Sequence, residues 1–305
     1  MGAQSVGTAG AGRPYALKAK KRGLKAFKIT AAALWLVICI FPFYWSIVTS
    51  LKPLNEIMIF SLWPKSPTWL NFKDAFLNKD LVRAVFNTVG VTVAGMGVNI
   101  AVSLLAGYAF ARIRFRGGKA MFKIMQASMM LPFAVMFIPT YIVLARFPLV
   151  GGNNILGQGG YGFVGQETQF LGIILPSCVS VYNIFFLRQF FLTLPNELGE
   201  SAKIDGAREL RIFALIYLPL MRPAVATLAI FTFQSGWNNY FWPYILGQGQ
   251  YKVLTIVLRQ YYTAIAPDHG VAMAFNLIIT IPMILFFIVF QRYFMSGLTA
   301  GSVKE

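Results

Sequence analysis

The side chains best suited to chemistry lie in one short polar stretch, residues 197–211, which stands between two apolar runs. Four of the ten acidic residues of the chain fall inside it, namely Glu197, Glu200, Asp205 and Glu209. This charge contrasts with the apolar runs on either side, so the stretch is suited to contact with something soluble. The pattern therefore favours binding to a soluble partner, and a loop that merely links two apolar segments is the alternative.

The composition is that of a protein selected for a lipid bilayer. Hydrophobic residues make up 57% of the chain and charged residues only 12%, against roughly a quarter charged in soluble domains. The net charge of +17 does not indicate nucleic-acid binding, because the basic residues flank apolar segments instead of forming a patch with exposed aromatics. Cys39 and Cys178 lie in apolar runs without metal-binding spacing, so we interpret them as packing residues.

Six apolar segments are long enough to cross about 30 Å of hydrocarbon as helices. They cover residues 29–48, 85–111, 122–144, 170–191, 212–233 and 271–290. In the second segment, small residues recur at helical spacing from Gly90 to Ala111, which predicts a central helix packed on more than one side. Prolines inside several other segments predict kinked helices around a cavity, although incidental kinks would give the same pattern.

The basic residues set the orientation of these segments, since lysine and arginine stay on the cytoplasmic side. With both termini cytoplasmic, nineteen of the 27 basic residues lie inside. We therefore predict an all-α integral membrane protein with six transmembrane helices. Its parts would be a flexible basic cytoplasmic tail (1–28), a first transmembrane helix (29–50), an extracytoplasmic loop (51–82), a five-helix core (83–296) with a cytoplasmic loop at 192–213, and a cytoplasmic tail (297–305).

The middles of the six segments carry no Asp, Glu, Lys, Arg or His. Such groups are costly in a bilayer and mark proton or ion pathways, so an ion-coupled carrier is disfavoured. The chain also lacks the Gly-rich loop with a terminal Lys and Ser or Thr that binds nucleotide phosphates. No nucleophile and base, or pair of carboxylates, can be placed together at one membrane depth. We therefore expect no catalysis in this chain, and any energy for transport must come from another polypeptide.

Residues 195–219 have the local signals of a short helix followed by a turn. Asn196 can cap the first amides, and Glu197 lies in the first turn, where the helix dipole favours a carboxylate. Gly206 permits a positive φ and a sharp change of direction. A second helical stretch would begin at Ala207 and continue into the fifth span.

The same residues resemble a known signature. Glu200-Ser201-Ala202, then Gly206 after three residues, then Ile216 and Leu218-Pro219, is similar to the EAA motif of permease subunits of binding-protein-dependent ABC importers. Two further stretches, residues 237–243 and 297–304, resemble carbohydrate-type permeases, specifically the shorter permease partner of the maltose transporter family. The resemblance covers about residues 29–305, and Ser201 in place of Ala is its one departure.

The resemblance implies a type I ABC importer fold in which the cytoplasmic loop docks on an ATP-hydrolysing subunit. The coupling helix and its turn would comprise Glu200, Ser201, Ala202, Lys203, Asp205 and Gly206, while Leu218 and Pro219 would position the start of span five. This chain would bind no cofactor, because ATP and Mg belong to the partner ATPase. The implied partners are a second homologous permease, two ATPase copies, an extracytoplasmic solute-binding protein, a carbohydrate and the lipid bilayer.

Amide and aromatic side chains at the outer end of span five are the candidate substrate contacts. Sugars are recognised by such mixtures, and the candidates are Gln234, Trp237, Asn238, Asn239 and Tyr240. An interfacial aromatic belt is the alternative interpretation. The expected function is sugar import, with import of a polyol or a glycerol-phosphate-like solute as the first alternative. An ion-coupled carrier and a membrane scaffold without transport activity remain further alternatives.

Overall fold

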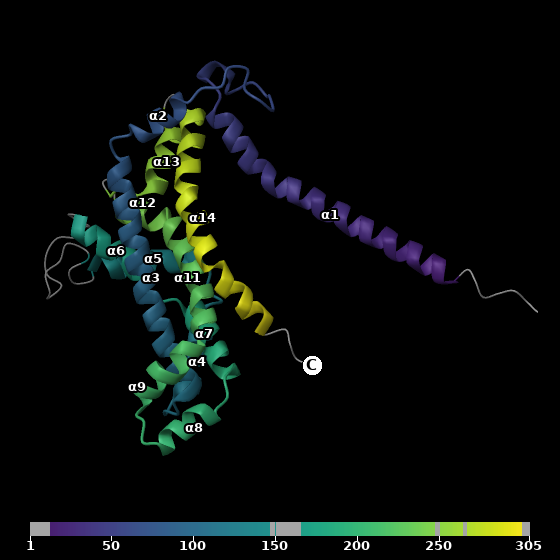
Figure 1. The fold of residues 1–305 in the computed structure, drawn as a ribbon. Helices are drawn as coiled ribbons and strands as arrows, with labels where there is room; N and C mark the ends of the chain where they lie inside the picture. Colours follow the sequence, from purple (N-terminus) through teal and green to yellow (C-terminus); the bar gives the residue numbers. More distant parts are fainter. Residues whose placement is uncertain (1–12, 147–149, 151–165, 248–250, 265–266, 301–305) are drawn as a thin grey trace, which may run out of the picture.

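The computed structural model describes residues 13–146, 150, 166–247, 251–264 and 267–300. Every regular element within these ranges is a helix (Figure 1), as the apolar segments predict. The outermost residues of the two predicted tails, 1–12 and 301–305, lie outside the described residues. Among the described residues, four helices are long and apolar enough to cross a membrane, and up to six spans result if each of two bent helix pairs counts as one.

Helix α1 (Arg13–Ser50) begins within the basic stretch that the sequence assigns to a flexible tail. This difference has a local cause, because Lys, Arg, Ala and Leu are strong helix formers and extend the helix beyond its apolar part. The apolar part, Lys25–Ser50, is only 6% buried over its most apolar window. Figure 1 shows α1 leaving the other helices at its Ser50 end and extending away from them.

The segment after α1 lies at one end of the helix bundle and contains η1 (Leu54–Glu56) and α2 (Leu70–Phe76). The buried Asn71 side chain of α2 donates hydrogen bonds to the carbonyl oxygens of Ser50 and Lys52, at 2.9 and 2.8 Å. These bonds fasten α2 to the end of α1, since a buried amide must find partners.

Helix α3 (Leu81–Arg112) is the central element, and it contacts α6 (Gln166–Cys178), α7 (Val181–Thr193) and α11 (Arg222–Trp237). Its small residues permit this closeness. A Cβ added at Gly107 would lie 3.2 Å from the backbone nitrogen of Arg188 in α7, and one at Gly236 of α11 would lie 3.2 Å from Thr92 of α3. The prediction that the second segment packs on several sides is therefore confirmed.

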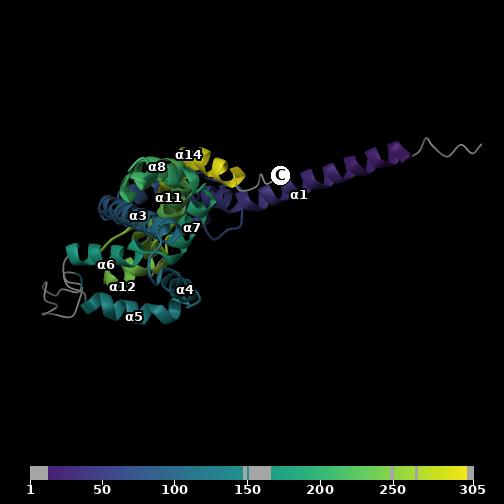
Figure 2. The ribbon, with the colours of Figure 1, turned by 90° about the horizontal axis from the view of Figure 1, so that it is seen from below.

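Two of the six predicted spans are sharply bent instead of continuous. The third is split into α4 (Gly118–Ser128) and α5 (Phe133–Arg146) at 110°, and the fifth bends by 77° between Leu220 and Arg222. Proline accounts for both positions, because Pro132 precedes α5 and Pro219 and Pro223 flank the second bend, where each removes an amide donor. Seen from below, α4 and α5 lie along one edge of the molecule, away from α14 (Figure 2).

The fourth span is interrupted between α6 and α7, and side-chain amides bridge the interruption. The Asn99 side chain of α3 donates to the carbonyl oxygen of Ser177 at 2.7 Å, and Asn183 donates to Asn99 Oδ1 at 2.6 Å. Ser180 caps α7 by accepting from the amide of Asn183. Backbone groups freed within a membrane must be satisfied by neighbours, and these side chains provide that.

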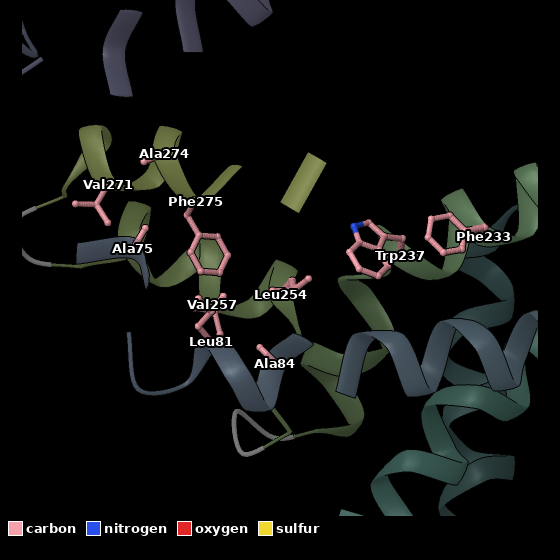
Figure 3. Packing of buried hydrophobic residues seen from close by; sticks show 10 residues of the cluster. All are labelled: Ala75, Leu81, Ala84, Phe233, Trp237, Leu254, Val257, Val271, Ala274 and Phe275. Atoms are coloured by element: carbon pink, nitrogen blue, oxygen red, sulfur yellow. The ribbon is translucent and has the colours of Figure 1, made fainter. Parts of the chain in front are cut away.

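The buried apolar residues that the structure describes form three clusters along the bundle. The first joins α2, α3, α11, α13 (Leu254–Thr263) and α14 (His269–Ala300), and Figure 3 shows Phe275 near Ala75 and Leu81, with Trp237 beside Phe233. The second surrounds α6 and α12 (Phe241–Leu246). The third lies at the opposite end of the bundle, beneath α8 (Glu197–Ile204), α9 (Glu209–Ile212), η2 (Phe213–Tyr217) and α10 (Leu218–Leu220).

Candidate functional site

The polar stretch forms α8, which lies at the end of the molecule opposite α2 (Figure 1). The helix begins at Glu197, and its side chains at Glu200, Ser201 and Lys203 are exposed. Ile204 is 87% exposed at the carboxyl end of the helix. Leu198 of the same helix is also exposed. An exposed short helix with large apolar side chains and several charges is a surface that a soluble protein can bind.

The predicted cap at Asn196 is wrong. The Asn196 side chain makes no capping bond, and its oxygen instead accepts a hydrogen bond from the Arg112 guanidinium. The Asn196 oxygen accepts from Arg112 instead of a helix amide because the other amine nitrogen of Arg112 donates to the carbonyl oxygens of Phe191 and Leu194. These bonds hold the guanidinium beside Asn196. Asn196 therefore ties the start of α8 to the end of α3.

The turn after α8 has the geometry that the sequence predicts. Gly206 has φ of +80°, a region that costs other residues energy. Its amide bonds to the carbonyl oxygen of Lys203 at 3.0 Å, and the Ala207 amide bonds to that of Ala202 at 2.9 Å. This pair of bonds is the Schellman motif, which satisfies the last carbonyls of the helix and fixes the angle between α8 and α9.

Gly199 is the point of closest approach between α8 and the membrane helices. It is buried in α8, and a Cβ added there would lie 2.7 Å from the hydroxyl oxygen of Tyr217. Tyr217 ends the π-helical segment η2 and is only 2% exposed. The helix therefore rests directly on a tyrosine that belongs to the start of the fifth span.

Tyr217 sits in an aromatic cluster that joins three membrane helices. Its ring centroid is 5.6 Å from that of Tyr108 in α3 and 6.3 Å from that of Phe191 in α7. The Arg112 guanidinium carbon lies 4.9 Å from the centroid of the Tyr217 ring, a cation–π contact. Because packed cores deform little, a displacement of Tyr217 must move its neighbours as well.

A hydrogen bond and an ion pair connect the same helices as this aromatic cluster. Glu209, the first residue of α9, accepts a hydrogen bond from the Tyr108 hydroxyl at 2.8 Å and forms an ion pair with Lys203 of α8. The ion pair is partly exposed and by itself adds little stability. It nevertheless connects α8, α9 and α3 in one chain of contacts.

The predicted residues at the start of span five occupy different positions. Leu218 packs against the third apolar cluster, whereas Pro219 is exposed. The π turn Phe213–Tyr217 comes just before them. Proline displaces the carbonyl four residues earlier, and a widened turn is one way in which a helix accommodates such a break.

Four residues of this site were absent from the sequence-based set: Tyr108, Arg112, Gly199 and Tyr217. Gly199 carried a usable signal, because glycine disfavours helix interiors and its presence in one indicates a close contact. The other three lie in different segments from α8, so no local pattern pointed to them.

The candidate substrate residues lie around the end of α11, and the structure separates them. Trp237 is 5% exposed, and its ring nitrogen donates to the carbonyl oxygen of Ile279 at 3.0 Å, so it is part of the apolar core (Figure 3). Gln234 and Asn238 are exposed. Asn239 accepts a hydrogen bond from Thr255 at its carbonyl oxygen.

Tyr240 lies beside a shallow pocket of about 450 Å³, whose other lining residues include Arg259, Thr255 and Tyr262. The Arg259 guanidinium carbon is 5.2 Å from the centroid of the Tyr240 ring. Burial raises the pKa of the Tyr262 hydroxyl. In the described part of the chain, no three His, Cys, Asp or Glu residues gather to hold a metal ion.

Comparison with known proteins gives a consistent result. Residues 99–299 match the family described as binding-protein-dependent transport system inner membrane components. The chain is 30% identical to the lactose transport system permease protein LacG of Rhizobium radiobacter, with 88% of this chain and 92% of the relative covered. It is 32% identical, with the same coverage, to the arabinooligosaccharides transport system permease protein AraQ of Halalkalibacterium halodurans.

A solved structure has the same fold. A chain of a bacterial ABC transporter involved in the import of the acidic polysaccharide alginate superimposes with a TM-score of 0.75. The sequence identity is 20%, and 90% of this chain and 98% of the other are covered.

Proposed function

Because the chain belongs to the family of binding-protein-dependent transport system inner membrane components, we propose that it is the permease subunit through which an ABC importer moves an oligosaccharide. As a member of that family it is a multi-pass inner membrane protein and not itself an enzyme. A carbohydrate is the proposed substrate because the chain is similar, over 88% of its length, to permeases of lactose and arabinooligosaccharide transport systems.

The exposed face of α8 is the proposed docking site for the ATP-hydrolysing subunit, on the cytoplasmic side. The residues that would meet it are Glu200, Ser201, Ala202 and Lys203, with Asp205 and Gly206 in the turn. Gly199, on the buried side of α8, rests on Tyr217, and the exposed Lys203 pairs with Glu209 at the start of α9. Closure of two ATPase copies would push α8, and these contacts would transmit the displacement to α3 and to the fifth span.

A second homologous permease subunit is the proposed neighbour within the membrane. Helix α1 supports this proposal, because its span is 6% buried by its own chain and its apolar side chains, such as Leu34 and Trp35, are more than 60% exposed. A second set of helices would provide the packing surface that this chain does not supply.

The solute-binding protein would deliver the sugar at the opposite, α2 end. Farther along the bundle, where Gly236 packs on Thr92 of α3, the exposed amides of Gln234 and Asn238 and the ring of Tyr240, beside its pocket, offer hydrogen bonds and an aromatic face. Sugars need both kinds of contact. Trp237 would support these side chains from within the core.

The deciding experiment measures ATP hydrolysis by the purified complex with and without the binding protein and candidate sugars. We expect stimulation only when the binding protein and its oligosaccharide are both present. Glu200→Lys reverses a charge on the docking face and should lower the stimulated rate while the protein stays inserted. Lys25→Glu, a charge reversal on the exposed surface of α1, is the matched control, because it lies on neither the α8 face nor the α2 end.

Stimulation by glycerol 3-phosphate but by no sugar would contradict the carbohydrate proposal. A wild-type rate for the Glu200→Lys variant would contradict the docking site, and it would leave the assignment of the carbohydrate untouched.

A further inference from the structure

A second site lies beside the coupling elements, at the junction between the membrane helices and α8. It is a groove of about 1620 Å³ between the α3–α4 turn on one wall and α8, α9 and the end of α7 on the other. Six basic side chains line it, against two carboxylates, Glu200 and Glu209. Such an excess of one charge in a concave site attracts an anion.

Three of the six cations are already engaged in contacts within the chain. Arg112 bonds to carbonyl oxygens, Arg188 donates to the Phe110 carbonyl oxygen at 3.2 Å, and Lys203 pairs with Glu209. The other three, Arg114, Lys119 and Lys123, have no ion pair or hydrogen bond to any described residue. They all belong to the α3–α4 turn or to the first turns of α4.

The guanidinium of Arg112 is only partly satisfied by its own chain. The Nε of Arg112 is buried and has no hydrogen-bond partner in the described part of the chain. The guanidinium also has no carboxylate partner among the described residues. Arg112 therefore brings an unneutralised positive charge to the lining of the groove, beside the free cations of the α3–α4 turn.

Exposed apolar side chains also line the groove. Phe115 and Leu192 are 43% and 46% exposed there. A soluble anion would leave these side chains unused. An occupant that carries both a negative headgroup and hydrocarbon matches both parts of the surface.

The depth of the groove fits the same occupant. Arg112 ends α3, a helix long and apolar enough to cross the membrane, so the cations stand where the hydrocarbon gives way to headgroups. Basic pockets between helices on the cytoplasmic side bind anionic headgroups. We propose that this groove binds an anionic glycerophospholipid of the inner leaflet, its phosphate between Arg112, Lys119 and Lys123 and its acyl chains along α4 and α7.

The bound lipid would join the α3–α4 turn to the coupling helix. Glu200 and Lys203 of α8 line the same groove, so a lipid held there touches the element proposed to meet the ATPase. The inference goes beyond the proposed function, because lipid binding requires neither a sugar nor ATP.

The test uses the full chain, purified with its partner subunits in neutral phosphatidylcholine nanodiscs, to which phosphatidylglycerol is added in increasing amounts. Native mass spectrometry counts the phosphatidylglycerol molecules retained. The variant Lys119→Gln/Lys123→Gln removes two free cations, and it should bind phosphatidylglycerol about 30-fold more weakly, since each such charge contributes about a fivefold factor. The matched control is Lys73→Gln/Lys79→Gln, which removes two exposed lysines at the other end of the molecule.

Unchanged retention in the groove variant would overturn the proposal, as would an equal loss in both variants. Displacement of the lipid by inorganic phosphate or glycerol 3-phosphate at equal concentration would assign the groove to a soluble anion instead. If the double variant inserts poorly, Arg114→Gln serves the same test, with an expected weakening of about fivefold. Sugar-stimulated ATP hydrolysis is measured on the same samples in phosphatidylcholine alone. If the wild-type complex shows that stimulation while the groove variant retains the lipid unchanged, the lipid proposal fails and the proposed function stands.

Discussion

Replacing Gly199 with alanine should weaken the link between α8 and the membrane helices. The added Cβ would lie 2.7 Å from the Tyr217 hydroxyl oxygen, whereas ordinary contacts begin near 3.4 Å. One of the two groups must therefore shift by about 0.7 Å. Tyr217 is 2% exposed and is held by the rings of Tyr108 and Phe191, so the displacement falls mainly on α8.

The magnitude follows from two opposing effects. Overpacking a filled contact costs about 1 to 3 kcal/mol, while replacing a helical glycine with alanine contributes about 0.5 to 1 kcal/mol of stability. The net cost for the docked arrangement of α8 is thus between about 0 and 2.5 kcal/mol, and the upper limit corresponds to about a 70-fold change in its population.

The assay compares transport with ATP hydrolysis in proteoliposomes that contain the whole complex. We expect Gly199→Ala to lower the amount of substrate moved per ATP hydrolysed. Adding Tyr217→Phe should restore it, because the nearest remaining ring atoms lie 3.4 and 3.5 Å from the Cβ, which is ordinary contact. Gly97→Ala is the matched control, since a Cβ added there meets no atom within 4 Å.

Two results would refute this reasoning. One is a Gly199→Ala variant that behaves like Gly97→Ala in both coupling and thermal stability. The other is a double variant no better than the single one, which would show that the Tyr217 hydroxyl is not the obstacle.

Three further variants test other parts of the structure. Gly206→Pro cannot reach a φ of +80°, so it should leave the protein inserted but detach the ATPase in co-purification; intact co-purification would contradict the role of the turn. Asn99→Leu leaves the Asn183 amide and the carbonyl at the α6–α7 interruption unpaired, and should cost about 1 to 3 kcal/mol, seen as a lower thermal midpoint in detergent; an unchanged midpoint would show that water or lipid replaces the amide. Trp237→Phe removes the bond to Ile279 and should cost about 1 kcal/mol with little effect on sugar-stimulated ATP hydrolysis; a large loss of stimulation at unchanged stability would make Trp237 a substrate contact.

Several features of the fold could be predicted from local patterns. Apolar length gave the membrane segments, and the small residues of the second segment indicated the packing now seen at Gly107. The positive φ of Gly206 followed from its place after a short helix. In each case the signal and the structural feature belong to the same few residues.

Other features depend on residues that are distant in the chain. The prediction that Asn196 caps α8 failed because Arg112, 84 positions away, takes the side-chain oxygen instead. The prolines of the third and fifth spans indicate where each helix bends, but they do not determine the angle of the bend. The neighbouring helices set that angle.

The sequence by itself determined that the chain is a helical membrane protein with one short charged stretch between its apolar segments. Hydrophobic length, the distribution of basic residues and a short motif are properties of contiguous residues. They can therefore be recognised in the sequence without knowledge of the fold. Only the tertiary structure decided how that stretch is attached to the membrane helices. Gly199 on Tyr217, Tyr108 on Glu209 and Arg112 across the end of α7 are contacts between separate segments. Contacts of this kind arise from packing and from the need of buried polar groups for partners, neither of which is encoded at a single position.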